Sequence, residues 1–563
     1  MSATLQTRAL EPRAQAAVAW WKAVPVLGSE SLVLLCSLLF TVASNGAFWH
    51  AALSSPLQQW RLALSLFLIV TALHAFLLGL VVNRWTAKPL LSVLLLVTAA
   101  AAHYMNAYGV YLDADMLRNV PHTDSKESGE LLTWGLLLPV LLTLIPVGLL
   151  WRTQLPRRTW KRAVLIRAAF LLGMLLMGAA GFMMSSQGVS SLVRSHREVR
   201  YLVAPANYLV SLVNALHASP PGPKRALLAV GLDAVKTTRP PGSRPRLLVL
   251  VVGETMRAQN WGLNGYARQT TPELAQIDGL LNFSDMTACG TSTEVSLPCM
   301  FSARGRSSYD EAYIRSHQSL LHVLDHAGIG VLWRDNQSGC KGVCDDLQTQ
   351  RLEDGKDPAL CNGKRCLDGI LLSGLAAQLS PPQGDRVVVL HQLGNHGPNY
   401  FERYPQEFKR FTPTCDSPEL DQCKREQIVN AYDNAVSYTD HFLAQTVGLL
   451  KSQHDYDTAM IYVSDHGESL GEKGLFLHGV PYAIAPQEQT RVPLVMWFSP
   501  SFAASRGLDL ACVRQRAQRY TDHDNLFPSV LGLMQVTTTA YDRQWDLFAG
   551  CESGAVRGAT HAP

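Results

Sequence analysis

Charge is scarce in this sequence. Only 17% of its 563 residues are Asp, Glu, Lys or Arg, whereas 47% are hydrophobic, which is little charge for a wholly soluble protein. The formal net charge is +4, and no basic stripe alternates with aromatic residues. We therefore expect no nucleic-acid partner. The length is compatible with two to four domains.

Cysteine is nearly absent from the first half of the chain, which contains only Cys36. The other ten lie between residues 289 and 551, and eight of them are close neighbours in sequence. Clusters of this kind indicate disulfides and an oxidising compartment, whereas a zinc ribbon would need paired Cys-x2-Cys knuckles. A fifth bridge, between Cys512 and Cys551, stays open. The predicted pairs are Cys289–Cys299, Cys340–Cys344, Cys361–Cys366 and Cys415–Cys423.

Long apolar runs dominate the N-terminal region, and no small-residue cleavage site of a signal peptide follows the first of them. Each run is long enough to cross a hydrocarbon core, and Leu/Val-rich runs of this length lack the polar face of a helix in a soluble bundle. We therefore predict five transmembrane helices. They cover residues 31–49, 61–82, 89–105, 131–151 and 163–184.

Lys and Arg are unevenly distributed around these runs. Arg8, Arg13 and Lys22 precede the first run, and further basic residues separate the second from the third and the fourth from the fifth. The loops at 50–60 and 106–130 contain few Lys or Arg residues. The positive-inside rule then places the N-terminus in the cytoplasm and the chain after the fifth run outside, in agreement with the cysteine distribution.

Composition divides the chain into three predicted parts. Residues 1–184 form the transmembrane domain with five helices. Residues 185–245 form connecting helices and a Pro/Gly-rich linker, and the helical part either lies along the membrane surface or packs on the soluble domain. Residues 246–563 alternate β-branched runs with helical stretches, which predicts an α/β domain with a largely parallel sheet between helices. The external loop 106–130 is either solvated or contacts a lipid headgroup.

Metal-ligating residue types follow several predicted strands, and ligands of parallel sheets bind beyond the carboxyl ends of the strands. One His in such a place is usually a hydrogen-bonded loop residue, but their joint occurrence favours a metal site. Three of them would supply ligands for a tetrahedral Zn²⁺ and leave a fourth position for a nucleophile. The three are Glu254, which follows residues 247–252, and Asp465 and His466, which follow 458–463. His396 after 386–390, and His478 further along, would be proton donors or hold a second metal.

The run Cys289–Cys299 is rich in hydroxyl groups. Coordination to Zn²⁺ would lower the pKa of one hydroxyl and supply an alkoxide nucleophile. Chemistry alone does not choose among Thr291, Ser292, Thr293 and Ser296.

Motifs in the second half form an ordered series: Val252–Arg257, Asn264–Arg268, Cys289–Thr293, Ser296–Phe301, Trp333–Asn336, Asn395–Pro398, Tyr438–Asp440, Ser464–Glu468 and Leu477–Gly479. The series resembles the membrane-bound lipid A phosphoethanolamine transferases, which include the mobile colistin-resistance enzymes and belong to the alkaline phosphatase/sulfatase superfamily. The resemblance extends over nearly the whole chain, including the membrane segments.

The resemblance implies roles for individual residues. Glu254, Thr293, Asp465 and His466 would be the primary zinc ligands, with Thr293 as the residue that accepts phosphoethanolamine. His396 and His478 would bind substrate or a second zinc ion, and Lys341, with Gln337 or Asn336, would contact the headgroup or phosphate. Asn106 would contact substrate from the third membrane segment, although Val110 one turn later lacks a hydroxyl. Glu294 stands beside the nucleophile where a small or apolar residue is expected.

The implied reaction has two steps. Thr293 attacks phosphatidylethanolamine and releases diacylglycerol, and a lipid A phosphate then takes phosphoethanolamine from Thr293. Zinc is the implied cofactor, with one ion tightly bound and a second left open. The added ammonium would mask a negative charge and weaken the attraction of polymyxins. We expect a monomer in the bacterial inner membrane with a periplasmic catalytic domain.

Three alternative functions remain at this point. The same transfer could reach another acceptor, such as a lipopolysaccharide core sugar, a periplasmic glucan or a protein. A related superfamily member could transfer glycerol phosphate, whereas a sulfatase is disfavoured because Leu297-Pro298-Cys299 is not a formylglycine motif. A membrane protein with a purely structural metal site would not be an enzyme.

Overall fold

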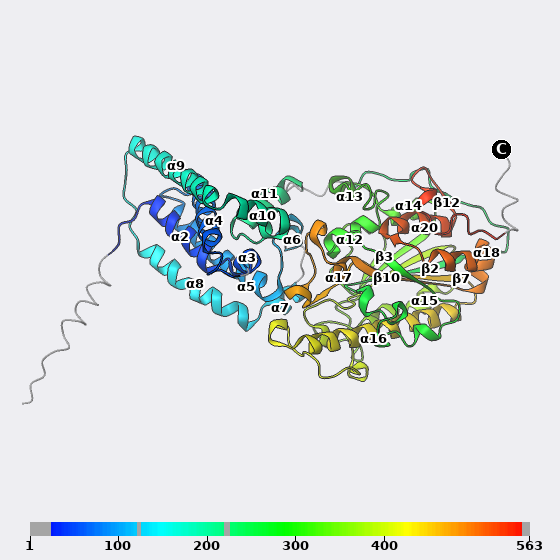
Figure 1. The fold of residues 1–563 in the computed structure, drawn as a ribbon. Coiled ribbons are helices and arrows are strands. Elements are labelled where there is room, and N and C mark those ends of the chain that lie inside the picture. Colours follow the sequence, from blue (N-terminus) through cyan, green and yellow to red (C-terminus); the bar gives the residue numbers. More distant parts are fainter. Residues whose placement is uncertain (1–23, 54, 121–124, 219–225, 554–563) are drawn as a thin grey trace, which may run out of the picture. The chain divides into compact units, whose positions relative to one another are not determined.

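The chain forms two compact units in the computed structural model. One unit combines the residues up to Asn106 with Trp134–Val210, and the other combines Ala107–Thr133 with the residues from Ser211 onward. The basic residues Arg8, Arg13 and Lys22, as well as Thr123 and Asp124 of the external loop and the proline-rich run at 219–223, lie outside the described residues. The structure describes residues 24–53, 55–120, 125–218 and 226–553 (Figure 1).

The first unit consists of apolar helices. Four helices in the described residues are long and apolar enough to cross a membrane, or five spans if α2 and α3 count as one. Two shorter helices follow the last long one. The helices are α2 (Ser29–Ala43), α3 (Gly46–Ala52), α4 (Trp60–Val81), α5 (Ala87–Tyr108), α8 (Trp134–Arg152), α9 (Trp160–Met184), α10 (Ser186–Ser195) and α11 (Ala206–Ala218), the last of which continues into the second unit.

The first predicted span is a bent pair rather than one straight helix. α2 and α3 meet at an angle of 60°, and Asn45 is buried at the break. Its Nδ2 donates to the carbonyl oxygens of Phe40 at 2.8 Å and Ala204 at 2.7 Å, and its Oδ1 accepts from the Ala204 amide at 2.8 Å. The side chain thus satisfies backbone groups near the break, so that the bend leaves fewer of them without partners in an apolar environment.

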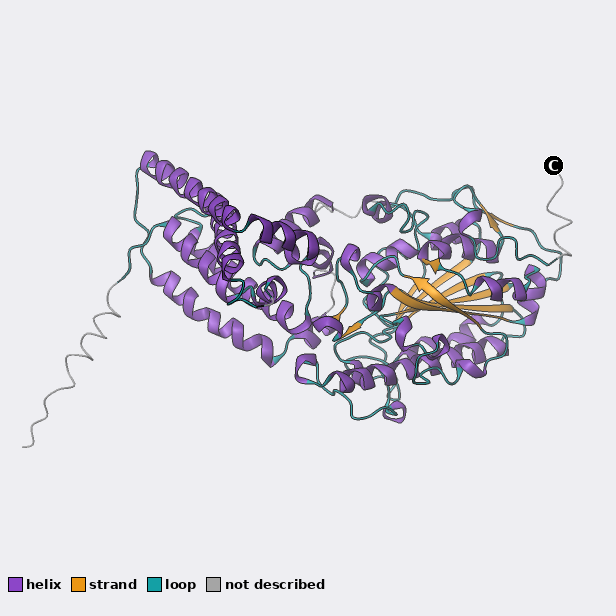
Figure 2. Cartoon of the chain, in the orientation of Figure 1, coloured by secondary structure: helices purple, strands orange, loops and turns teal. Residues whose placement is uncertain are grey.

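An eight-stranded sheet lies at the centre of the second unit, between two layers of helices (Figure 2). Its order is β11-β3-β10-β7-β2-β6-β4-β5. β7, β2, β6, β4 and β5 are parallel, whereas β10 is antiparallel to both β7 and β3. The strands are β2 (Arg246–Gly253), β3 (Leu281–Thr287), β4 (Gly330–Asp335), β5 (Thr349–Arg351), β6 (Arg386–His391), β7 (Asp457–Ser464), β10 (Arg491–Phe498) and β11 (Thr521–Asp522).

The sheet confirms the predicted α/β fold. Its central strands are continuous apolar runs, as expected where helices cover both faces of a parallel sheet. β3 was missed because its residues alternate between buried and partly exposed positions. One face packs against α14 (Leu320–His326) and α20 (Leu526–Met534), and the other against α15 (Leu375–Leu379) and the long α16 (Arg425–Ser452) (Figure 1).

Shorter elements surround this core. Ala107–Thr133, which includes much of the predicted external loop, contributes two short helices to this unit. Two small antiparallel pairs, β1–β12 and β8–β9, lie apart from the main sheet. The elements are α6 (Ala114–Asn119), α7 (Ser125–Leu131), β1 (Val235–Lys236), α12 (Thr293–Met300), α13 (Glu311–Ser316), β8 (Ser469–Leu470), β9 (Phe476–Leu477), α17 (Gln487–Thr490), α18 (Pro500–Arg506), α19 (Leu510–Arg516) and β12 (Val536–Thr537).

The disulfide prediction is confirmed. All four predicted pairs are bonded, and the open case, Cys512–Cys551, is a fifth bridge. Cys36, in the first unit, is a buried free thiol.

Truncation of a β2 side chain tests how much of the stability depends on this sheet. Leu250 is fully buried, whereas Leu232 of the same unit is 74% exposed. We expect Leu250→Ala to lower the free energy of unfolding by about 2–5 kcal/mol, and Leu232→Ala to change it by less than about 0.5 kcal/mol. Denaturant unfolding of the purified variants measures both. Equal losses would contradict the central position of β2.

Candidate active site

Four neighbouring parallel strands deliver the polar residues of the site. In the sheet order β7-β2-β6-β4, Asp465 and His466 follow β7, and Glu254 follows β2. His396 comes after β6, and Gln337 after β4. The carboxyl ends of parallel strands meet at one edge of the sheet, so the topology alone brings these residues together.

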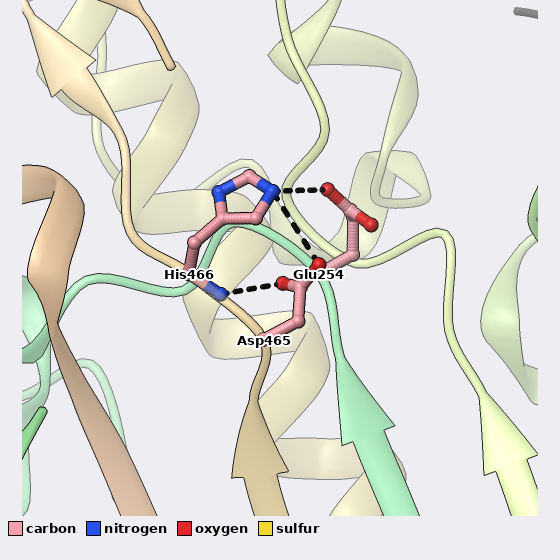
Figure 3. Close-up of side chains that lie close together, drawn as sticks. All are labelled: Glu254, Asp465 and His466. Carbon is pink, nitrogen blue, oxygen red and sulfur yellow. Dashed lines mark hydrogen bonds and ion pairs between the residues drawn. The ribbon is translucent and has the colours of Figure 1, made fainter. Parts of the chain in front are cut away.

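The innermost group contains Glu254, Asp465 and His466, which point toward one another beyond the strand ends (Figure 3). One ligand atom from each lies within 4.8 Å of the others, and all three residues are fully buried. His466 Nε2 is 3.4 Å from both Glu254 Oε1 and Asp465 Oδ2. Because His466 Nδ1 lies 2.9 Å from the Gly467 carbonyl oxygen and donates to it, Nε2 is the nitrogen that faces the carboxylates.

The charges of this group are not balanced. Burial and the neighbouring Glu254 carboxylate raise the pKa of Asp465 to about 7. Burial opposes the charged form of His466, but Asp465 and Glu254 raise its pKa to about 10. Among the described residues, Asp465 Oδ2 makes no hydrogen bond. Two carboxylates and an imidazole with an unsatisfied oxygen fit the nitrogen and oxygen donor set of a Zn²⁺ ion.

Thr293 lies at this group. Its Oγ1 donates to Glu254 Oε2 at 3.0 Å and lies 3.4 Å from His466 Nε2. Thr293 is the first residue of α12, where amide groups without intrahelical partners favour an anion such as a phosphoryl group. The Cys289–Cys299 disulfide joins the turn before α12 to its last turn.

Two of the rival hydroxyls have other partners. Thr291 Oγ1 donates to the Val480 carbonyl oxygen at 2.7 Å, and Ser296 Oγ donates to the Asp465 carbonyl oxygen. Ser292 is the residue before α12. The hydroxyl that lies against the carboxylate and imidazole groups is therefore that of Thr293.

The backbone around the site is tightly constrained. Gly394 has φ +55°, and a Cβ there would lie 2.6 Å from the carbonyl oxygen of Glu254, so only glycine lets the loop after β6 approach this closely. Thr255 and Leu477, next to Glu254 and His478, also have positive φ values of 52° and 60°. Such conformations are strained for β-branched or bulky residues and cluster at functional sites.

A second polar group adjoins the first. His396 Nε2 is 3.1 Å from Glu127 Oε1, and His478 Nδ1 is 3.0 Å from Glu468 Oε2. The His478 ring lies 5.4 Å from that of His396 and 4.5 Å from that of His466. The structure thus brings both predicted histidines to the site.

Glu127 is the contribution of α7 to this group. Burial alone would raise the pKa of Glu127, but His396 lowers it to about 2. Burial disfavours the imidazolium of His396, yet Glu127 raises its pKa to about 9. The sequence hypothesis placed a headgroup contact in this external loop without choosing a residue. The only sequence signal was the acidity of the loop.

Other predicted residues have different positions. Gln337 Nε2 donates to Glu254 Oε2 at 3.0 Å, whereas Asn336 donates to Asp368 at 2.9 Å. Lys341 has a positive φ of 50° and donates to Ser338 Oγ at 2.9 Å. Asn106 is the last residue of its stretch in the first unit, and its contact with substrate stays a prediction.

Glu294 is directed toward Arg315. Its side chain is 1% exposed, and Arg315 Nη2 lies 2.8 Å from its Oε1 and donates to its carbonyl oxygen at 2.9 Å. Arg315 also pairs with Glu311 at 3.4 Å. The carboxylate beside Thr293 therefore has a cationic partner, Arg315.

Known proteins resemble this chain in sequence and in fold. A family model described as Sulfatase matches residues 246–536, and one described as Phosphoethanolamine transferase EptA/EptB matches residues 70–219. The chain is 36% identical over 543 residues to phosphoethanolamine transferase EptA of Escherichia coli (strain K12), with 94% of this chain and 98% of that protein covered. The chain belongs to the phosphoethanolamine transferase family.

Further similarities agree with this family. The chain is 37% identical over 520 residues to phosphatidylethanolamine transferase Mcr-2 of Escherichia coli, with 90% of this chain and 95% of that protein covered. The integral membrane protein lipooligosaccharide phosphoethanolamine transferase A of Neisseria meningitidis has a TM-score of 0.89 and 36% identity, covering 94% of this chain and all (100%) of that one. The predicted family and superfamily are confirmed, and the chain is a transferase with apolar helices that can span a membrane.

Removal of a ligand tests the innermost group as a metal site. We expect His466→Asn to lower the zinc content of the purified protein by about tenfold or more, because the variant loses one of the three protein ligands. His441→Asn is the matched control, because His441 is paired with Glu273 at 2.9 Å and belongs to neither group. Elemental mass spectrometry measures the content. Equal zinc in both variants would contradict the assignment.

The Glu127–His396 pair predicts a pH dependence of stability. The pKa of His396 is about 9 in the folded protein and about 6.5 in the unfolded chain. Protonation of His396 therefore stabilises the fold fully below about pH 6.5, and this stabilisation is lost as the pH rises through about 9. We expect chelator-treated wild type to exceed Glu127→Gln in stability by roughly 2–3 kcal/mol near pH 6. The difference should shrink toward pH 9.5. Denaturant unfolding at several pH values measures it, and a constant difference would refute the pairing.

Proposed function

We propose that this protein transfers phosphoethanolamine from phosphatidylethanolamine to a phosphate of lipid A, with Thr293 as the covalent carrier. The observation that carries the proposal is the position of the Thr293 hydroxyl, 3.0 Å from Glu254 and 3.4 Å from His466 at the start of α12. The names of relatives support the substrates, since one is a phosphatidylethanolamine transferase and another a lipooligosaccharide phosphoethanolamine transferase.

The innermost group has two tasks in this mechanism: its carboxylates and imidazole bind the metal, and the metal activates the hydroxyl of Thr293. Glu254, Asp465 and His466 would hold Zn²⁺, which when bound lowers the pKa of a coordinated hydroxyl and offsets negative charge on phosphoryl oxygens. Thr293 Oγ1 attacks the phosphorus of the donor. The bond between phosphorus and the diacylglycerol oxygen breaks, and phosphoethanolamine stays on Thr293. In the second step, a lipid A phosphate oxygen attacks the same phosphorus and the Thr293 hydroxyl is restored.

The second group, His396 and His478 with their carboxylate partners, supplies protons and positive charge. Glu127 keeps the His396 imidazole protonated at neutral pH, so that its N–H groups stabilise negative charge or supply a proton to the leaving diacylglycerol oxygen. Glu468 accepts the Nδ1–H of His478 and thereby orients that ring. A second zinc ion bound by His396 and His478 remains the alternative use of these rings.

Location follows from the substrates. Both are membrane lipids, which supports a protein of the bacterial inner membrane with its disulfide-bonded domain in the periplasm, where disulfides persist. The added ammonium would reduce the attraction of cationic peptides to the cell surface. A monomer suffices for this mechanism, because all of the residues named come from one chain.

Expression in a bacterium without its own phosphoethanolamine transferases tests the proposal. We expect lipid A to gain phosphoethanolamine and polymyxin resistance to rise. Thr293→Ala should reduce the transfer by roughly 10³-fold or more, because the nucleophile is lost. Thr291→Val should stay within about tenfold of wild type, since it loses one neutral hydrogen bond. Mass spectrometry of lipid A and of the trapped protein measures both.

Two outcomes would contradict this function. Unmodified lipid A together with phosphoethanolamine on a core sugar or a periplasmic glucan would refute the acceptor. Undiminished transfer by folded Thr293→Ala would refute the carrier.

A further inference from the structure

α7 presents two carboxylates on one face. Glu127 and Glu130 are three residues apart, so that they lie one above the other on the helix. Glu127 Oε1 is 3.1 Å from His396 Nε2, and Glu130 Oε2 is 2.6 Å from Arg403 Nη2. Arg403 also donates from Nε to the carbonyl oxygen of His396 at 2.7 Å. The helix therefore holds His396 through its ring directly and through its backbone by way of Arg403.

This network is shielded from solvent. The side chain of Arg403 is 1% exposed and that of Glu130 is 11% exposed. Burial alone would raise the pKa of Glu130, but Arg403 and Arg365 lower it, so the carboxyl is charged at neutral pH. Only a guanidinium offers separate N–H groups in a fixed fork that reach two acceptors at once, and a lysine in place of Arg403 would lose one of them.

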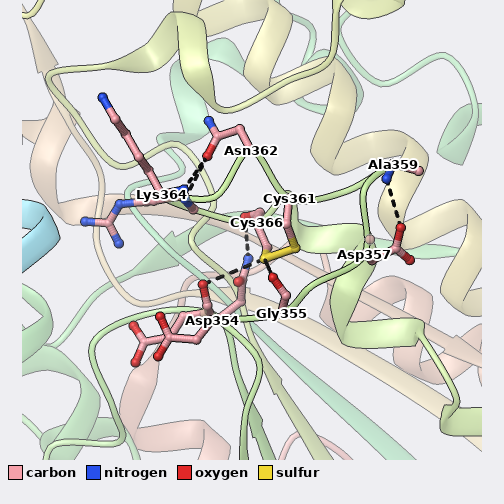
Figure 4. Close-up of a disulfide and its surroundings, with 12 residues drawn as sticks. Asp354, Gly355, Asp357, Ala359, Cys361, Asn362, Lys364 and Cys366 are labelled. Carbon is pink, nitrogen blue, oxygen red and sulfur yellow. Dashed lines mark hydrogen bonds between the residues drawn. A yellow bond between two sulfur atoms is a disulfide. The ribbon is translucent and has the colours of Figure 1, made fainter.

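A disulfide-closed hairpin supplies a second cation to Glu130. Arg365 Nε is 2.8 Å from Glu130 Oε1. Arg365 precedes Cys366, whose bond to Cys361 closes the hairpin (Figure 4). Within it, Asn362 Oδ1 accepts from the Arg365 amide at 2.8 Å, and the Asn362 amide donates to the Arg365 carbonyl oxygen at 3.1 Å. The covalent closure restricts the backbone that carries the guanidinium.

We propose that Glu130, Arg403 and Arg365 are positioning residues that dock α7 and thereby fix the orientation of His396. None of the three contacts Thr293 in the described structure. Their effect on the reaction passes through Glu127 and His396, and this part rests on the proposed function. The docking itself does not.

Hydrogen exchange tests the docking without any assay of transfer. In the full-length protein in detergent micelles, we expect Glu130→Gln to raise amide exchange in residues 125–131 by tenfold or more, because a buried charged hydrogen bond is lost. Asp354→Asn is the matched control, since it removes the pair between Lys126 of the same helix and a 77% exposed carboxylate, and such pairs contribute little. Unchanged exchange in folded Glu130→Gln would overturn the proposal.

Kinetics test the consequence for the reaction. We expect Glu130→Gln and Arg403→Lys to lower kcat by about tenfold or more, with unchanged zinc content in the innermost group and the activity of Asp354→Asn as reference. Lysine should fail to replace Arg403 although it keeps the charge. Increased exchange with wild-type kcat in both variants would refute the positioning of His396, while inactivity of the wild type would refute only the proposed function.

A disulfide variant covers the case in which Glu130→Gln does not fold. Replacement of Cys361 and Cys366 by serine frees the hairpin that carries Arg365 and should raise exchange in residues 125–131. The matched control replaces Cys415 and Cys423, which form another disulfide of the same unit. Equal exchange of residues 125–131 in the two disulfide variants would overturn the role of the hairpin.

Discussion

The rest of the structure depends on the burial of two carboxylates at one point. Glu254 and Asp465 converge on one imidazole with no solvent access, and burying charge without compensation is costly. A cation at this point would compensate for the carboxylates, so the group fits a metal site better than ordinary core. The parallel sheet makes this convergence possible because β7 and β2 are neighbours and end at the same edge.

Hydrogen bonding distinguishes Thr293 from the neighbouring hydroxyl groups. Of the hydroxyls in the run before Cys299, Thr291 and Ser296 donate to backbone carbonyl oxygens, while Thr293 faces the carboxylate. The disulfide constrains the turn, and the start of α12 favours negative charge. The glycine that allows the approach to Glu254 and the strained Thr255 lie at the same place. Unfavourable local conformations thus occur beside the polar residues of the site.

Much of this could be predicted from the sequence because it depends on local patterns. Buried parallel strands are apolar runs, so β2 and β7 and the residues after them were evident. The bend at Asn45 was not, because its partner Ala204 lies 159 residues away. Nothing in the sequence around Glu294 indicated that Arg315 pairs with its carboxylate. The site role of Glu127 depends on His396, which lies far along the chain, and no periodicity encodes such a pairing.

The segment between α5 and α8 forms ion pairs on both sides of the site. Through α6, Arg118 pairs with Glu311 at 2.9 Å. Glu311 in turn pairs with Arg315, which pairs with Glu294 beside Thr293. Through α7, Glu127 and Glu130 act on His396. Both helices belong to one short segment whose two ends continue into long apolar helices. A displacement of this segment would therefore change the ion pairs that reach Glu294, next to Thr293, and the contacts of His396 together.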